Sequence, residues 1–164
     1  MSRKYLLGID AGTSLIKATI YDLDYKECGV GSRTVEVESP RPSWAQQDPN
    51  AVWVATAASI REAIKTAGID AREIAVVGPS GQGDGAWMLD EEGNPISPAL
   101  LWNDGRAAEI IAQWEREGIL TQAFKTGGTL LWPGSLAPVF AWLRENEPET
   151  FDRIETVFCC KDWI

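Results

Sequence analysis

Residues 6–22 constrain the fold of this chain more than any other stretch. An apolar run leads into the turn Asp-Ala-Gly-Thr-Ser, and a second run rich in β-branched residues follows it. This pattern predicts a β-hairpin, with Gly12 supplying the backbone freedom that the turn needs. Because Gly12 carries no Cβ, an anionic ligand can also approach the backbone closely at the turn.

The side chains at the hairpin tip are suited to binding a metal ion and a phosphate. Asp10 ends the first predicted strand, and its carboxylate can hold a hard cation directly or through water. The N–H groups of residues 11–14, with the Thr13 and Ser14 hydroxyls, can form an anion-binding concavity, and Lys17 adds a positive charge within reach. The plainer interpretation is a polar turn in which aspartate and glycine serve only the turn.

The rest of the chain reads as alternating helices and strands. A helix is predicted from Asp48-Pro49 to about Ala67, because aspartate is a good N-cap and proline suits the first helical position. Its expected buried stripe is Trp53, Ala57, Ile60, Ile64 and Ala67. The other predicted elements are strands at 30–37, 74–78 (buried and parallel), 86–90 and 156–160 (buried), an extended segment at 96–102, and helices after Asn103-Asp104 and at 136–145.

Composition excludes several classes of function. With a net charge of -9, we expect neither nucleic acid nor an anionic membrane as a partner. The chain has no histidine, so a Ser-His-Asp triad and a histidine zinc site are ruled out within it. Its three cysteines lack C-x-x-C spacing and favour a reduced, cytoplasmic setting. No stretch approaches transmembrane length, so no membrane association is expected.

A second polar constellation follows the predicted strand at 74–78. Three glycines within residues 81–85 exceed what a simple turn needs and indicate close approach of a ligand, although Asp84 alone would also suit a turn. Gln82, Asp84, Asn103 and Asp104 together offer the amides and carboxylates that bind hydroxyls. Trp102 is equally compatible with packing and with a binding surface for a carbon skeleton, whereas packing is favoured for Trp87. Arg106 suits either an ion pair or a substrate contact.

Several motifs resemble a known family when they are taken in order. G-I-D-A-G-T-S-x-x-K at residues 8–17 resembles the phosphate loop of the FGGY carbohydrate kinases, within the actin and hexokinase superfamily. G-Q-G-D-G at 81–85 and L-W-N-D-x-R at 101–106 occur at the matching places, and C-K-D-W at 160–163 resembles the segment before the next core helix. Each motif alone is weak, but the ordered set covers the whole chain and is specific.

The resemblance implies a fold, a reaction and a set of site residues. The fold is α/β and ribonuclease-H-like, with a mixed sheet that starts with three antiparallel strands and is flanked by helices. The reaction is transfer of the ATP γ-phosphoryl group to a sugar or polyol hydroxyl, with Mg²⁺. Asp10 would hold the metal; Gly12, Thr13, Ser14 and Lys17 would face the nucleotide phosphates; and Gln82, Gly83, Asp84, Trp102 and Asn103 would form the sugar pocket.

Two departures from the family pattern refine these expectations. Xylulose kinases usually have Met-His, and glycerol kinases Arg-Glu, where this chain has Gly83-Asp84. The Gly-Asp pair is similar to the pair at this position in erythritol kinases and some L-xylulose kinases. We therefore expect the substrate to be a small polyol or ketose. Family members also run several hundred residues further. Residues 1–164 are therefore interpreted as part of the N-terminal domain, inactive alone, with the catalytic aspartate base beyond residue 164.

Other interpretations stay open on the sequence. The alternatives to a kinase are a non-catalytic domain that binds a polyol or a phosphate, and a purely structural member of the same fold. The expected partners are a sugar or polyol and ATP, and a homodimer is left open.

Overall fold

The computed structural model describes residues 4–164, and these form two compact units. Unit 1 comprises the described residues up to Val37, Pro49–Gln82 and Cys160–Ile164, and unit 2 comprises Glu38–Asp48 and Gly83–Cys159. The chain thus passes from unit 1 into unit 2 between Gln82 and Gly83, inside the glycine-rich loop. None of the described helices is long and apolar enough to cross a membrane.

Unit 1 contains the predicted mixed sheet, with strand order β3-β2-β1-β5. Strands β1, β2 and β3 are antiparallel neighbours, and β5 runs parallel to β1. The hairpin and the parallel strand are therefore confirmed. The strands are β1 (Tyr5–Ala11), β2 (Leu15–Asp22), β3 (Glu27–Thr34) and β5 (Ile74–Gly81).

Strand β3 lies three residues earlier in the chain than the predicted 30–37. The reason is a tight turn at residues 22–26, after which the strand begins sooner than its alternating pattern indicated. The Asp22 carboxylate accepts hydrogen bonds from the backbone N–H groups of Asp24 (3.0 Å) and Lys26 (2.9 Å), and Tyr25 adopts a left-handed backbone conformation. An aspartate that bonds to the backbone two residues later is a common way to close a turn, so β3 begins at once.

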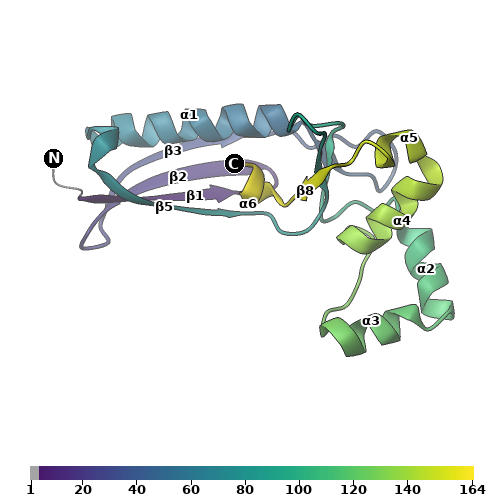
Figure 1. Cartoon of the computed structure of the whole chain (residues 1–164). Coiled ribbons are helices and arrows are strands. Elements are labelled where there is room, and N and C mark those ends of the chain that lie inside the picture. Colours follow the sequence, from purple (N-terminus) through teal and green to yellow (C-terminus); the bar gives the residue numbers. More distant parts are fainter. Residues whose placement is uncertain (1–3) are drawn as a thin grey trace. The chain divides into compact units, whose positions relative to one another are not determined.

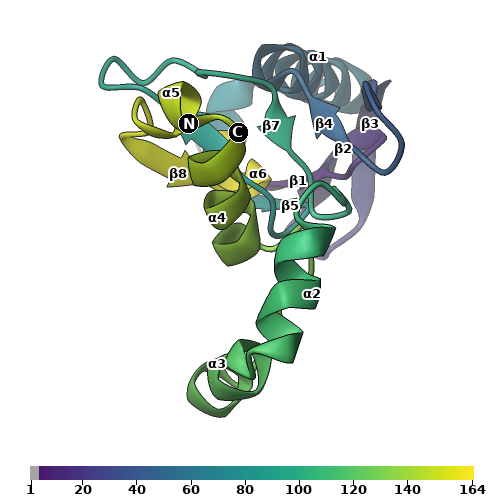
Figure 2. The ribbon, with the colours of Figure 1, turned by 90° about the vertical axis from the view of Figure 1, so that its right-hand side faces the viewer.

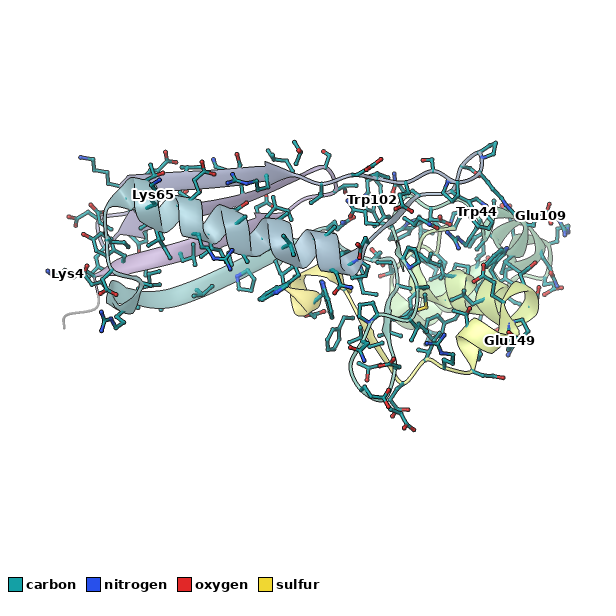
Figure 3. The ribbon with its side chains drawn as sticks, turned by 90° about the horizontal axis from the view of Figure 1, so that it is seen from above. Lys4, Trp44, Lys65, Trp102, Glu109 and Glu149 are labelled. Atoms are coloured by element: carbon teal, nitrogen blue, oxygen red, sulfur yellow. The ribbon has the colours of Figure 1, made fainter. Side chains whose placement is uncertain are left out.

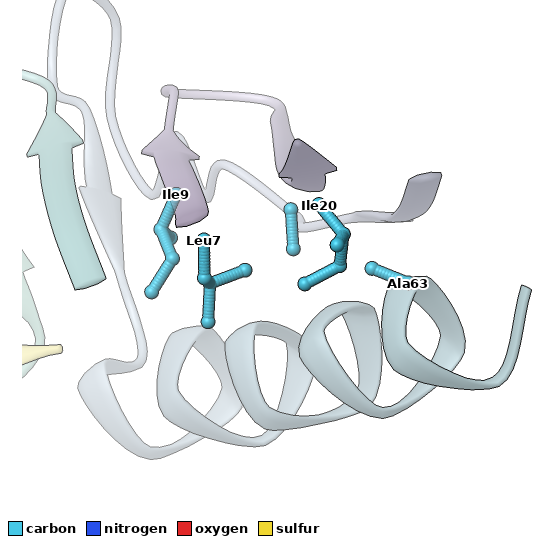
Figure 4. Close-up of a cluster of buried hydrophobic side chains, with 5 residues drawn as sticks. Leu7, Ile9, Ile20 and Ala63 are labelled. Atoms are coloured by element: carbon cyan, nitrogen blue, oxygen red, sulfur yellow. The ribbon is translucent and has the colours of Figure 1, made fainter. Parts of the chain in front are cut away.

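Helix α1 (Pro49–Ala67) packs along one face of β1, β2 and β3 (Figure 1). The sheet and the helix share a core of Leu7, Ile9, Ala18, Ile20 and Ala63 (Figure 4). The helix begins at the predicted proline, and its predicted stripe is confirmed in part, because Ile60, Ile64 and Ala67 are partly buried and pack against this core. The fully buried positions inside the helix are Val52, Thr56, Ser59 and Ala63, whereas Trp53 remains 48% exposed.

Two glycines of β3 explain why small residues form that stripe. A Cβ on Gly29 would lie 2.5 Å from the Ala67 nitrogen, and one on Gly31 would lie 2.2 Å from the Ser59 carbonyl oxygen. The helix backbone thus approaches the strand backbone so closely that no side chain fits between them at these points. Only small residues on α1 can face β3 at that distance, and the large Trp53 side chain points elsewhere.

The prediction that the 74–78 strand is buried is wrong for the described chain. Val76 and Val77 of β5 are 58% and 52% exposed. The apolar run was interpreted as a strand covered on both faces. In unit 1, α1 packs against β1, β2 and β3, and this leaves the middle of β5 open among the described residues.

Unit 2 consists of helices and two small antiparallel sheets. One pairs β4 with β7 (Figure 2), and the other pairs β6 with β8. A core of Ala86, Met88, Leu100, Val139 and Leu143 lies within it. Its elements are β4 (Gln46–Gln47), β6 (Trp87–Leu89), β7 (Ala99–Leu100), α2 (Ala108–Arg116), α3 (Ile119–Gly127), α4 (Leu136–Asn146), α5 (Pro148–Phe151) and β8 (Thr156–Phe158). A 3₁₀ turn (Ala71–Glu73) and α6 (Cys160–Trp163) belong to unit 1.

Several predictions in unit 2 need correction. The last strand, predicted as buried over 156–160, is the half-buried β8, which ends at Phe158 and pairs with β6. Helix α2 begins at Ala108, so neither Asn103 nor Asp104 caps it. Helix α3 was not predicted, although its apolar residues Ile119, Leu120, Ala123 and Phe124 recur at helical spacing. The helix at 136–145 and the packing role of Trp87, which is 1% exposed, are confirmed.

Candidate functional site

The predicted site residues separate into two clusters, one on each unit. We call the first the phosphate cluster: Asp10, Gly12, Thr13, Ser14, Lys17 and Gln82, all in unit 1. We call the second the sugar cluster: Gly83, Asp84, Trp102 and Asn103, all in unit 2. Each cluster is described within its own unit.

The alternation of the sheet places Asp10 on the face opposite α1. Leu7 and Ile9 of β1 are buried against the helix, so Asp10 points to the other side, where it is exposed. In the ladder Asp10 lies opposite Lys17 of β2 and Ser80 of β5. These three residues line an open pocket of about 340 Å³. The sheet itself, which fixes strand register, therefore brings together a carboxylate, an ammonium group and a hydroxyl.

The hairpin tip uses part of its hydrogen-bonding capacity to hold its own shape. The Gly12 N–H donates to the Leu15 carbonyl oxygen at 3.1 Å, so this group is engaged in the turn, contrary to the expectation that all four N–H groups of residues 11–14 face a ligand. A Cβ on Gly12 would lie 2.9 Å from the same oxygen, which explains the glycine. Thr13 is half-buried, and Ser14 is exposed.

Gln82 belongs structurally with the hairpin. Its backbone N–H donates to the Ala11 carbonyl oxygen at 2.9 Å, and its side-chain oxygen accepts a hydrogen bond from the Thr13 hydroxyl at 3.2 Å. The sequence interpretation placed Gln82 in the sugar pocket, and that role stays a prediction; within unit 1 its side chain contacts Thr13 of the phosphate cluster. The short C-terminal helix also contacts this end of the sheet, since the Cys160 thiol lies 3.8 Å from the same carbonyl oxygen of Ala11.

The phosphate cluster has the donor set that a Mg²⁺–nucleotide pair requires. Among residues 4–164 no group of three or more His, Cys, Asp or Glu side chains is arranged to hold a metal by itself. Mg²⁺, however, usually keeps several waters and binds one or two carboxylates together with substrate phosphates. One exposed carboxylate at Asp10, with Lys17 opposite it, fits this arrangement.

In unit 2, Asp84 protrudes from a strained loop. Asp84 and Gly85 both have left-handed backbone conformations, with φ of 53° and 74°. A Cβ on Gly85 would lie 2.2 Å from the Leu100 carbonyl oxygen, and the Gly85 N–H donates to the Gly134 carbonyl oxygen at 3.2 Å. Gly85 thus anchors the loop to two other segments and leaves the Asp84 side chain exposed.

Trp102 and Asn103 form the tip of a turn closed by the Asp104 N–H, which donates to the Leu101 carbonyl oxygen at 2.9 Å. Both tip side chains are exposed, Trp102 by 45%. Figure 3 labels Trp102 among the side chains of the chain. The indole N–H of Trp132 donates to the Trp102 carbonyl oxygen at 2.9 Å. A Cβ on Gly134 would approach that oxygen to 1.9 Å. Three segments, at residues 83–85, 101–104 and 132–134, therefore converge.

Sequence reasoning missed the 132–134 segment. The signal available there was the Trp-Pro-Gly run, in which a tryptophan precedes two residues that favour turns. Asp104 and Arg106, which the sequence left between structural and ligand-binding roles, form a buried ion pair at 2.8 Å. Asp104 is therefore not available to bind hydroxyls.

The mixed sheet, the hairpin with its carboxylate and the glycine-rich loop are features that the resemblance to the FGGY kinases predicts. The family model described as "FGGY family of carbohydrate kinases, N-terminal domain" matches residues 5–164. This chain belongs to the FGGY family of carbohydrate kinases.

Curated relatives and solved structures agree with this assignment. The chain is 34% identical to the L-xylulose/3-keto-L-gulonate kinase of Escherichia coli over 161 residues, and 33% identical to the xylulose kinase of the same organism over 160 residues. These alignments cover 98% and 96% of this chain but 32% of each relative. The crystal structure of a xyloylose kinase from Brucella ovis superposes with a TM-score of 0.89 at 31% identity, over 97% of this chain and 33% of that one. The chain spans about a third of the length of these relatives.

Proposed function

We propose that this chain supplies the phosphate-binding hairpin and part of the sugar pocket of a kinase that transfers a phosphoryl group from ATP to a small ketose or polyol. The observation that carries the proposal is the Asp10–Lys17 pair on the open face of the sheet, next to a hairpin tip that carries two hydroxyls. A carboxylate, an ammonium group and hydroxyls around a glycine turn suit a metal-bound polyphosphate better than they suit a plain turn.

The roles within the phosphate cluster follow from its chemistry. Asp10 would hold Mg²⁺, which when bound would supply positive charge that offsets the charge of the nucleotide phosphates. The Lys17 ammonium group would contribute a second positive charge next to the nucleotide phosphates. The Ser14 hydroxyl would donate to a phosphate oxygen. The Thr13 hydroxyl donates its one hydrogen to the Gln82 side-chain oxygen at 3.2 Å, so it would have to leave that partner to donate to a phosphate. Gly12 keeps the backbone accessible.

The roles within the sugar cluster follow from its exposure. The Asp84 carboxylate can accept hydrogen bonds from two neighbouring hydroxyls, and the Asn103 amide can both donate and accept. The exposed Trp102 ring offers an apolar surface for the C–H faces of a sugar. Gly83 has no atom within 4 Å of an added Cβ, so open space surrounds it. Because Gly83-Asp84 differs from the pairs expected in xylulose and glycerol kinases, a ketose such as L-xylulose or a small polyol is the proposed substrate.

Removal of the proton from the accepting hydroxyl needs a carboxylate in reach, and no residue of this chain matches the family's catalytic base. We therefore propose that phosphoryl transfer needs sequence that this chain does not contain. What the chain itself would do is bind metal–nucleotide phosphates and sugar.

The test begins with the length of the native protein, measured as its intact mass in the source cells. Protein of native length would then be incubated with ATP, Mg²⁺ and a panel of ketoses and polyols, and ADP and sugar phosphate would be measured. Phosphorylation of a ketose or polyol is the expected result. Binding of sugar or Mg²⁺–ATP without turnover by the native-length protein would instead identify a binding module, and binding of neither would refute the proposal.

A further inference from the structure

The turn that carries Trp102 and Asn103 has no regular secondary structure of its own, yet it is held on both sides. On one side the Leu101 N–H donates to the Ala45 carbonyl oxygen at 3.0 Å. On the other, the Gly105 N–H donates to the Ser43 carbonyl oxygen at 2.7 Å. The turn is thus fastened to residues 43–45, which lie far from it in sequence but within the same unit.

The Asp104 carboxylate joins these attachments. One oxygen accepts the Ala45 N–H at 2.7 Å, and the other accepts the Arg106 N–H at 2.9 Å. The Arg106 side chain adds two further bonds, Nε at 2.8 Å and Nη2 at 3.1 Å. Asp104 is 0% and Arg106 3% exposed at the side chain, so solvent replaces none of these bonds. The buried carboxylate of Asp104 therefore links the turn to residues 43–45 and to Arg106, which precedes α2.

The guanidinium of Arg106 is fixed in turn by aromatic rings. It lies 4.1 Å from the centre of the Trp44 ring and 5.2 Å from that of Trp142, and the two rings meet edge to face with centres 5.4 Å apart. Nη2 also donates to the Gln46 side-chain oxygen at 3.3 Å. A planar cation held this way cannot rotate without losing several contacts.

We propose that Asp104 and Arg106 are positioning residues for the sugar pocket: they hold the Trp102–Asn103 turn in its binding conformation without touching the sugar. This inference rests on the proposed function of Trp102 and Asn103. Its physical basis is that a buried ion pair adds little stability over apolar residues of similar size, whereas this pair supplies directional bonds that apolar residues cannot. The network is therefore better explained by the geometry it imposes than by stability.

A turn without this network would sample several conformations. The sugar would then bind only the fraction of molecules in which the turn is formed, and its apparent affinity falls by that fraction. Binding of Mg²⁺–ATP depends on residues of unit 1 and would not change. The predicted signature is a rise in KM for the sugar with the KM for ATP unaltered.

The experiment compares two Arg–carboxylate pairs in protein of native length. The test variant is Asp104→Leu with Arg106→Met, which removes both buried charges and keeps apolar volume. The matched control is Arg33→Gln with Glu62→Gln, which removes an exposed pair on unit 1. Amide hydrogen exchange of Leu101 and Gly105 reports the order of the turn directly, because their N–H groups donate to the Ala45 and Ser43 carbonyl oxygens and not to the altered side chains. The KM values for sugar and ATP report its effect on binding.

The expected result is exchange at these two amides at least about tenfold faster in the test variant, with α4 still protected, and a sugar KM raised about tenfold. The control variant should match the unaltered protein in amide exchange, in the KM for sugar and in the KM for ATP. Unchanged exchange and an unchanged sugar KM in a folded test variant would overturn the inference. If the double variant does not fold, Arg106→Lys decides by the same readouts, because it keeps the charge but loses the planar contacts. If the unaltered protein uses no sugar, the proposed function fails, and hydrogen exchange then decides only whether the Asp104–Arg106 pair keeps the turn ordered.

Discussion

Replacing Gly31 with alanine tests how closely α1 packs on the sheet. The new Cβ would lie 2.2 Å from the Ser59 carbonyl oxygen, 2.7 Å from the Glu62 Cβ and 2.8 Å from the Ala63 nitrogen. Two of these atoms belong to the helix backbone, so rotating a side chain cannot relieve the clash. The helix must move away from β3, which loosens the contacts of the core that it shares with the sheet.

The size of the effect follows from two opposing contributions. Overpacking a core costs about 1–3 kcal/mol, and the upper half of that range applies when backbone atoms clash. Against this, replacing glycine restricts the unfolded chain and stabilises by about 0.4–1 kcal/mol. The expected net loss is about 2 kcal/mol, which lowers Tm by about 4–8 °C in a protein of this size.

The matched control is Gly78→Ala, in β5 of the same sheet, where an added Cβ meets nothing within 4 Å. Only the unfolded-state contribution acts there, so Tm should stay the same or rise slightly. Thermal unfolding followed by far-ultraviolet circular dichroism measures both variants. If Gly31→Ala melts together with Gly78→Ala, the close packing of α1 on β3 is not the constraint that we infer.

Three further predictions follow from single carboxylates. Hydrogen bonds from Arg72 lower the pKa of Asp70 from 3.8 to about 2, so its stabilisation is complete above pH 3.8 and is lost as the pH falls toward 2. The Tm difference between the unaltered protein and Asp70→Asn should therefore shrink over that window; a constant difference would contradict it. Asp10→Asn should weaken Mg²⁺-dependent nucleotide binding about tenfold or more, measured by calorimetry with and without Mg²⁺, and a normal Mg²⁺ dependence would exclude the metal role. Replacing Asp84 with glycine keeps the left-handed backbone without strain, so Tm should be retained. The variant should bind sugar about 10- to 100-fold more weakly, because it lacks the carboxylate. An unchanged sugar affinity would show that Asp84 does not belong to the pocket.

Elements that depend on near neighbours in the chain could be predicted from the sequence. The hairpin at the N-terminus follows from two apolar runs around a glycine turn, and α1 begins at the proline that the N-cap pattern indicated. The helix at Leu136–Asn146 likewise follows from its own periodicity. The family resemblance also came from local motifs, because the residues of each motif lie within ten positions of one another. Such features need no knowledge of what packs against them.

What lies opposite each element was decided by the tertiary structure. The buried stripe of α1 is shifted because Gly29 and Gly31, about thirty residues away in sequence, bring the helix close to β3. Val76 and Val77 look like core residues but are exposed, because α1 packs on the other strands.

The same distinction separates the candidate site residues. The sequence determined which side chains can bind a metal, a phosphate or a hydroxyl, since that is a property of the residue type. Only the fold decided that the Gln82 side chain accepts a hydrogen bond from Thr13, and that Asp104 forms a buried ion pair with Arg106 instead of facing a ligand. Those outcomes depend on distances between segments that are remote in sequence, and local patterns carry no information about such distances.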